Sequence, residues 1–123
     1  MTGEQVKQLK GHSNKINTIV FCPDDRQIAS ASNDRTLRLW DTVTGKQIQQ
    51  LEGHSGYVRA ISFSPDGKQL ASVSYDRTIR LWVTATGEQV QQLEGYNHYV
   101  RVVVFSSDGK QLASASCDRT VVL

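Results

Sequence analysis

The sequence predicts an all-β protein built from repeated units of four short antiparallel strands, with about three units in the chain. The first observation is a repeat: Gly11-His12 recurs 42 residues later as Gly53-His54, and residues 11–52 and 53–94 are identical at about 25 of 42 positions. The second observation is the local sequence pattern, in which short stretches of alternating apolar residues are separated by turn residues. No segment sustains a helical period, which leaves strands as the repeating element.

The second unit illustrates the expected order of strands. Residues 57–63 alternate and form the first strand, and residues 64–67 (Ser-Pro-Asp-Gly) form a turn in which Pro presets φ and Gly adopts a positive φ. Residues 69–74 form a second strand with small side chains suited to a tight interior. Residues 78–82 form a third, β-rich strand. Residues 89–93 form a fourth strand, whose glutamines suit a solvent-exposed outer edge.

Composition narrows the class of protein. With 123 residues, 38% hydrophobic and 21% charged, the chain has the size and composition of one ordinary globular domain. Its net charge of +2 comes from mixed signs, which disfavours nucleic acid as a partner. No window approaches the roughly 18 apolar residues of a membrane span, and the polar start lacks a secretory signal. We therefore expect a cytoplasmic protein with no membrane partner.

Two cysteines and one isolated histidine are the remaining candidates for metal or redox chemistry. Cys22 and Cys117 fit neither a metal-ligand spacing nor a disulfide framework, so they are expected to be free thiols in a reducing compartment. His98 has no neighbouring ligand residues. The sequence thus predicts no metal site and no cofactor.

A period of 40–45 residues with four strands, a Gly-His near the start and a Trp-Asp near the end is typical of a β-propeller blade. The stretches GHSNKINTIVFCPDDRQIASASNDRTLRLWD and GHSGYVRAISFSPDGKQLASVSYDRTIRLW resemble the WD-repeat β-propeller family almost position for position, and the resemblance covers essentially the whole chain. Val83, Tyr96 and Ser107 depart from the pattern, replacing an Asp, a His and a turn Pro. The implied division is an outer strand 2–10, a blade 11–52, a blade 53–94 and an incomplete blade 95–123.

His, Ser and Asp side chains recur in an order that could be mistaken for a hydrolase triad. An activated nucleophile needs an exposed oxygen, an adjacent base and an oxyanion site, and active sites are seldom duplicated within one chain. The resemblance implies instead buried hydrogen-bond chains that run from a Trp indole through Ser and His to Asp and lock the strands together. The implied chains consist of Trp40, Ser30, His12 and Asp34, of Trp82, Ser72, His54 and Asp76, and of Ser114 and Asp118 in the third unit. No catalytic residue is predicted, and the chain is not expected to be an enzyme.

The resemblance also implies a partner-binding face at the starts of the first strands and the turns between second and third strands. Residues there vary between units while the framework stays nearly constant, and variable residues on a repeated framework are the ones that determine binding specificity. Tyr and Arg are enriched at interaction hot spots, and the set contains basic but no acidic residues, so we expect a protein or peptide that is acidic or phosphorylated. The implied contact residues are Lys15, Asn17, Asn33, Tyr57, Arg59, Tyr75, Tyr99, Arg101 and Cys117.

The two ends of the chain predict self-association. Residues 2–9 match residues 86–93 at all positions but one and so correspond to an outer strand, while the last unit stops inside its third strand. A ring of three blades is too tight, and an open stack exposes apolar flanks and a strand edge. We expect a homo-oligomer, with a dimer of six blades preferred to a trimer of nine. The competing interpretation is a fragment of a longer propeller.

Two functions follow from these features. The leading hypothesis is a protein–protein interaction scaffold that binds a protein or peptide on the propeller face. The alternative is a structural or assembly fragment of a longer propeller with no binding face of its own. Alanine at Tyr57, Arg59 and Arg101 discriminates between them, because it should abolish partner binding without altering assembly only under the first hypothesis.

Overall fold

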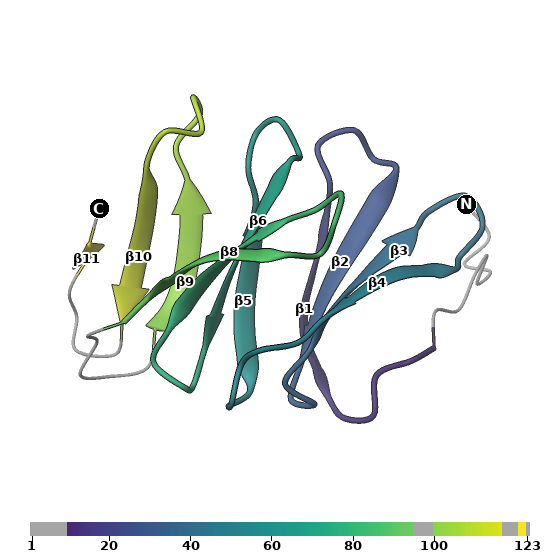
Figure 1. Ribbon diagram of the computed structural model, residues 1–123, viewed down its shortest axis with the longest axis horizontal. Coiled ribbons are helices and arrows are strands. Elements are labelled where there is room, and N and C mark those ends of the chain that lie inside the picture. The colour runs from purple at the N-terminus through teal and green to yellow at the C-terminus, as the bar shows by residue number, and fades with distance from the viewer. Residues whose placement is uncertain (1–9, 95–99, 117–120, 123) are drawn as a thin grey trace, which may run out of the picture.

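The computed structural model describes residues 10–94, 100–116 and 121–122, and every secondary-structure element in them is a strand (Figure 1). Three antiparallel sheets follow one another along the chain, in the strand orders β1-β2-β3-β4, β5-β6-β7-β8 and β11-β10-β9. The strands are β1 (Ile16–Phe21), β2 (Gln27–Ser32), β3 (Leu37–Asp41), β4 (Gln47–Leu51), β5 (Val58–Phe63), β6 (Gln69–Ser74), β7 (Ile79–Val83), β8 (Gln89–Leu93), β9 (Val100–Phe105), β10 (Leu112–Ser116) and β11 (Val121–Val122).

Tight turns join the strands, and their residues explain where each strand ends. In the β5–β6 turn, the Ser64 hydroxyl donates to Asp66 Oδ1 at 2.7 Å, and Gly67 takes the left-handed conformation with φ of 73°. Glycine adopts this conformation without a steric penalty. In the β1–β2 turn, Asp25 occupies the same repeat position and is held at a φ of 60°. The backbone therefore keeps one turn geometry even where the glycine is missing.

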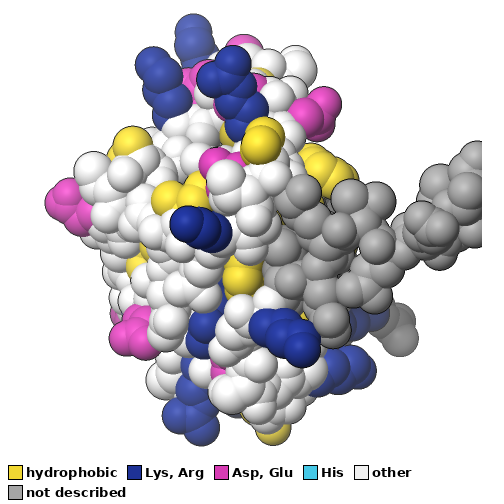
Figure 2. Space-filling view, turned by 90° about the vertical axis from the view of Figure 1, so that its right-hand side faces the viewer, with side chains coloured by type: hydrophobic (Ala, Val, Ile, Leu, Met, Phe, Trp, Pro, Cys, Tyr) yellow, Lys and Arg dark blue, Asp and Glu magenta, His cyan; other side chains and the backbone are white. Residues whose placement is uncertain are grey.

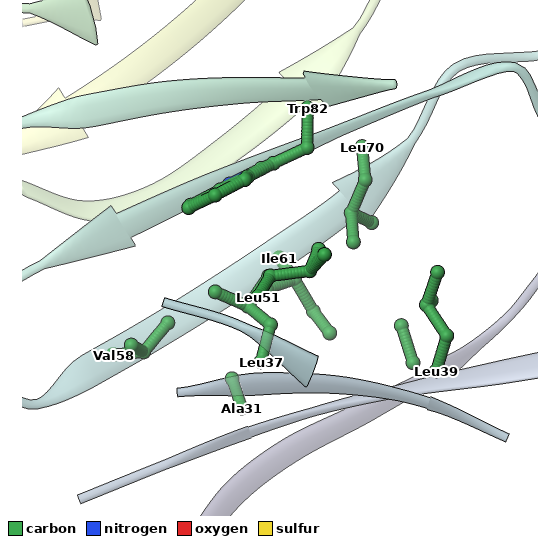
Figure 3. Packing of buried hydrophobic residues seen from close by; sticks show 9 residues of the cluster. Ala31, Leu37, Leu39, Leu51, Val58, Ile61, Leu70 and Trp82 are labelled. Atoms are coloured by element: carbon green, nitrogen blue, oxygen red, sulfur yellow. The ribbon is translucent and has the colours of Figure 1, made fainter. Parts of the chain in front are cut away.

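The sheets stack side by side, and apolar side chains fill the space between neighbours (Figures 1 and 3). Small and aliphatic residues of one sheet face a larger apolar set on the next. Between the first and second sheets, Ala31, Leu37, Leu39 and Leu51 pack against Val58, Ile61, Leu70 and Trp82. Between the second and third, Ala71, Val73 and Ile79 pack against Val100 and Val103. Each junction thus joins two chemically different flanks.

The structure confirms the prediction of an all-β fold made of four-stranded antiparallel blades. The three sheets do not close into a ring, and the first and third stand at opposite ends of the stack (Figure 1). The predicted outer strand 2–10 lies, apart from Lys10, outside the described residues. The described part of the chain includes no helix with the length and hydrophobicity that crossing a lipid bilayer requires.

Candidate protein-interaction face

A chain of side-chain hydrogen bonds crosses the second sheet. Trp82 Nε1 donates to Ser72 Oγ at 2.9 Å, Ser72 Oγ lies 2.7 Å from His54 Nε2, and His54 Nδ1 lies 2.8 Å from Asp76 Oδ2. A carboxylate can only accept hydrogen bonds, so His54 Nδ1–H donates to Asp76. The Ser72 oxygen already accepts a hydrogen bond from the indole N–H, so its hydroxyl donates to His54 Nε2. Ser72 is fully buried, which leaves no access for a substrate carbonyl. The hydrogen-bond chain therefore ties strands β6 and β7 to the turn between them and to the segment that precedes β5.

The first sheet repeats this chain at the equivalent positions. Trp40 Nε1 donates to Ser30 Oγ at 2.9 Å, Ser30 Oγ lies 2.6 Å from His12 Nε2, and His12 Nδ1 lies 2.8 Å from Asp34 Oδ2. In the third sheet Ser114 is buried, whereas Asp118 lies outside the described residues. Across the described residues, every buried side-chain nitrogen and oxygen has a hydrogen-bond partner. Such complete pairing makes the sheets a rigid frame.

Threonine and arginine side chains extend both chains, and the sequence interpretation missed them. Thr78 donates to Asp76 Oδ1 through its backbone N–H at 2.9 Å and its hydroxyl at 2.6 Å, and Arg80 Nη2 lies 3.6 Å from Asp76 Oδ2. Thr36 and Arg38 make the same contacts with the first-sheet aspartate. Both residue types repeat at the same spacing as the histidines, so the repeat itself carried the missing signal.

These donors determine the charge state of the two aspartates. Burial on its own would raise the pKa of Asp34, but hydrogen bonds from the Thr36 side chain, from His12 and from backbone N–H groups outweigh it and lower the pKa to about 2. The same contacts hold the pKa of Asp76 well below its ordinary value, against the opposing effect of burial. Both groups are therefore carboxylates at neutral pH, and they serve the frame as acceptors.

One repeated irregularity marks the candidate face. Asn17, Arg59 and Arg101 each lie where the first strand of their sheet has one residue more than the strand it pairs with. A bulge of this kind redirects the side chain of the extra residue. The three positions lie near the starts of β1, β5 and β9, which share the lower edge of the stack in Figure 1. All three are among the residues that the sequence interpretation assigned to partner contact.

Other predicted contact residues form two different pairs beside these bulges. In the second sheet, Tyr57 and Tyr75 are 43% and 39% exposed, and their ring centroids lie 5.7 Å apart. In the first sheet, the Asn17 side-chain amide donates to Asn33 Oδ1 at 2.7 Å and to the Val58 carbonyl at 2.8 Å. The asparagines therefore tie two neighbouring sheets together, whereas the tyrosines present an aromatic surface to solvent.

The charged members of the set complete the face. Lys15 and Arg101 are exposed and Arg59 is half-buried. Tyr99 and Cys117, which were also predicted to contact a partner, lie outside the described residues. Hereafter "the face" denotes the described members of the set, Lys15, Asn17, Asn33, Tyr57, Arg59, Tyr75 and Arg101.

The potential metal ligands and the cysteine thiol of the described residues complete the account of the reactive side chains. Within the described ranges, no group of three or more His, Cys, Asp and Glu side chains could hold a metal ion. Cys22 is a free, buried thiol, and burial raises its pKa above the ordinary value. A thiol in that state is a poor nucleophile.

The first two sheets each have four strands and a Trp–Ser–His–Asp hydrogen-bond chain, which are features of a WD-type propeller blade. Residues 3–41, 45–83 and 87–123 each match the family model described as WD domain, G-beta repeat. The chain belongs to the WD-repeat family.

Curated relatives are similar over single repeats. U3 small nucleolar RNA-associated protein 21 of Saccharomyces cerevisiae is 50% identical over 44 residues, which are 36% of this chain and 5% of that protein. The Serine-threonine kinase receptor-associated protein of Homo sapiens is 48% identical over 42 residues, 34% of this chain and 12% of that protein. The Notchless protein homolog of Arabidopsis thaliana is 47% identical over 38 residues, 31% of this chain and 8% of that protein. The matched part of this chain thus spans about an eighth or less of the length of these relatives.

Proposed function

We propose that this chain is a protein-interaction scaffold, not an enzyme, and that the face binds an acidic or phosphorylated peptide segment of its partner. The observation that supports this most is the exposed Tyr57–Tyr75 pair, with ring centroids 5.7 Å apart, on a frame whose buried side-chain nitrogen and oxygen atoms are all hydrogen-bonded in the described residues. Large amphipathic rings held on a rigid frame lose little conformational entropy on binding, which is why tyrosines are favoured at interaction hot spots.

The charge of the face supports the proposed partner chemistry. Lys15, Arg59 and Arg101 are basic, and the set contains no carboxylate. Arginine pairs with carboxylate or phosphate oxygens through two parallel hydrogen bonds, and the bulge positions Arg59 and Arg101 at equivalent points of neighbouring sheets. One extended acidic segment could therefore contact both arginines and also reach the tyrosine rings of the second sheet.

A peptide-array experiment tests the proposal with the chain as it exists. Matched peptides are spotted with serine, phosphoserine, glutamate or lysine at the same positions, and bound chain is quantified. We expect retention on the phosphoserine and glutamate peptides, weakening as salt is raised, because exposed charges are screened. Equal retention on the lysine peptides would contradict the assignment of an acidic partner.

Substitutions then locate the binding surface. Tyr57→Ala and Arg101→Ala should each weaken binding by about tenfold or more, the usual loss when a hot-spot side chain is truncated. Lys68→Ala is the matched control, since Lys68 is an exposed cation at the β5–β6 turn, away from the starts of the first strands. If Lys68→Ala weakened binding as much as Arg101→Ala did, the attraction would be diffuse and the face would not be the site.

A second role, assembly, is supported by a separate observation. The outer flank of the first sheet exposes large apolar side chains, with Ile19 60% exposed and Phe21 59% exposed. We propose that the chain forms a homo-oligomer, a dimer of six blades in preference to a trimer of nine, because propellers of four to eight blades are the common closed forms. The free, buried thiol of Cys22 fits a reducing compartment, and the cytoplasm is the compartment that we propose.

A further inference from the structure

The first sheet ends the stack with an apolar flank that no described residue covers. Ile16, Ile19 and Phe21 are 46%, 60% and 59% exposed. Ile16 and Ile19, together with Ile28, Ser30 and Trp40, line a hollow of about 200 Å³ in this flank. Figure 2 views this end of the molecule and shows hydrophobic atoms at several places on it, with Lys and Arg side chains among and around them. We call this surface the isoleucine flank.

The second sheet carries the same flank at the same repeat positions, and there it is buried. Val58, Ile61, Leu70 and Trp82 stand 42 residues after Ile16, Ile19, Ile28 and Trp40. All four pack against the first sheet, and Ile61 is only 6% exposed (Figure 3). The third sheet buries Val100 and Val103 against the second in the same way. Two junctions inside the chain therefore show what kind of surface an isoleucine flank accepts.

The accepted surface is the opposite flank of a blade, formed by small residues of the second strand and aliphatic residues of the third. Ala29 and Ala31 supply it at the first junction, and Ala71 and Val73 supply it at the second. In the third sheet Ala113 and Ala115 hold these repeat positions. Leu112 packs toward the second sheet, so by strand alternation its neighbour Ala113 lies on the far side. The alanine flank is defined by Ala113 and Ala115.

We propose that the isoleucine flank of one copy docks on the alanine flank of a second copy, reproducing between chains the junction that already occurs twice within each chain. The proposal rests on the self-association proposed above and is independent of the face. Because the two flanks differ, the contact is heterologous, and each copy contributes a different flank. Ring closure as a dimer would use two such junctions.

Solution mass and two single substitutions test this proposal. Size-exclusion chromatography with light scattering is run on the full chain over a wide range of concentration. Wild type is expected to reach about twice 13.7 kDa, and Ile19→Arg and Ala113→Arg are each expected to stay at 13.7 kDa. Mixing the two variants restores one intact junction, because Ile19→Arg keeps its alanine flank and Ala113→Arg keeps its isoleucine flank. The mixture should therefore recover the dimer mass.

Controls keep a folding defect apart from a docking defect. Val90→Arg changes an aliphatic side chain that is 50% exposed on the outer strand β8, and it should leave the dimer intact. Phe21→Ser disrupts the isoleucine flank at a second exposed position. Circular dichroism of every variant checks that it keeps its strand content. A wild type that stays monomeric at every concentration overturns self-association and this proposal together. A wild-type dimer that survives Ile19→Arg and Ala113→Arg overturns only the choice of flanks.

Discussion

Removing the Asp76 carboxylate is the most direct test of the frame that supports the face. Its Oδ2 accepts from His54 Nδ1 at 2.8 Å and from the Ser55 backbone N–H at 3.0 Å. Its Oδ1 accepts from the backbone N–H and hydroxyl of Thr78 at 2.9 and 2.6 Å. Asp76→Ala removes all four acceptor contacts and adds no clash.

The expected loss follows from how many donors can find another partner. The exposed Ser55 N–H can turn to water, and the His54 Nδ1–H can donate to the Thr78 hydroxyl oxygen, which lies 3.4 Å away. The backbone N–H and the hydroxyl of Thr78, a buried residue, are the two donors that then lose their acceptor. A buried donor left unpaired costs about 1–3 kcal/mol, so with partial relaxation we expect a loss of about 2–4 kcal/mol in the free energy of unfolding.

Urea unfolding followed by tryptophan fluorescence measures this loss, since Trp82 ends the same hydrogen-bond chain. Asp66→Ala is the matched control, because Asp66 is an exposed turn aspartate of the same sheet that also accepts from a hydroxyl and a backbone N–H. Its removal should cost much less, because water can replace it. An unchanged unfolding midpoint for Asp76→Ala, or equal losses for both variants, would refute the reasoning.

Three further predictions concern pH, a turn and a junction. The free energy of unfolding should fall as pH drops from about 4 toward 2, because the pKa of Asp34 is lower in the folded chain (about 2) than in the unfolded chain (3.8), so the unfolded chain binds the proton first. Asp34→Asn should flatten this fall in an acid titration of unfolding. A level wild-type curve would contradict the prediction. Asp25→Gly should stabilise the chain by about 0.5–1 kcal/mol in urea unfolding, because glycine holds a positive φ without strain, as Gly67 does. A lower free energy of unfolding for this variant would show that Asp25 is not strained. Asn17→Ala should cost about 1–2 kcal/mol in the same assay, because the Val58 carbonyl loses its donor from the neighbouring sheet, and no change would show that the contact is dispensable.

Strand positions could be predicted from the sequence because they depend on local chemistry. The turn residues Pro65 and Gly67 and the alternation of residues 57–63 act within a few positions, and β5 and β6 begin and end within one residue of the expected ranges. The extra contacts of Thr78 and Arg80 were missed because the sequence interpretation considered only the residues of the implied chain. The roles of the face residues remain predictions until binding is measured.

The tertiary structure decided what equivalent positions do. Asn33 and Tyr75 hold the same place in the repeat, yet Asn33 joins a hydrogen-bonded bridge between sheets, whereas Tyr75 forms a tilted, partly exposed ring pair with Tyr57. Ile19 and Ile61 are the same residue at the same repeat position, but they are 60% and 6% exposed. The repeat by itself determined the strands, the turns and the apolar pattern, since these depend on near neighbours in the chain. Burial depends on whether another sheet lies alongside, and that is a property of the stack that no single repeat encodes.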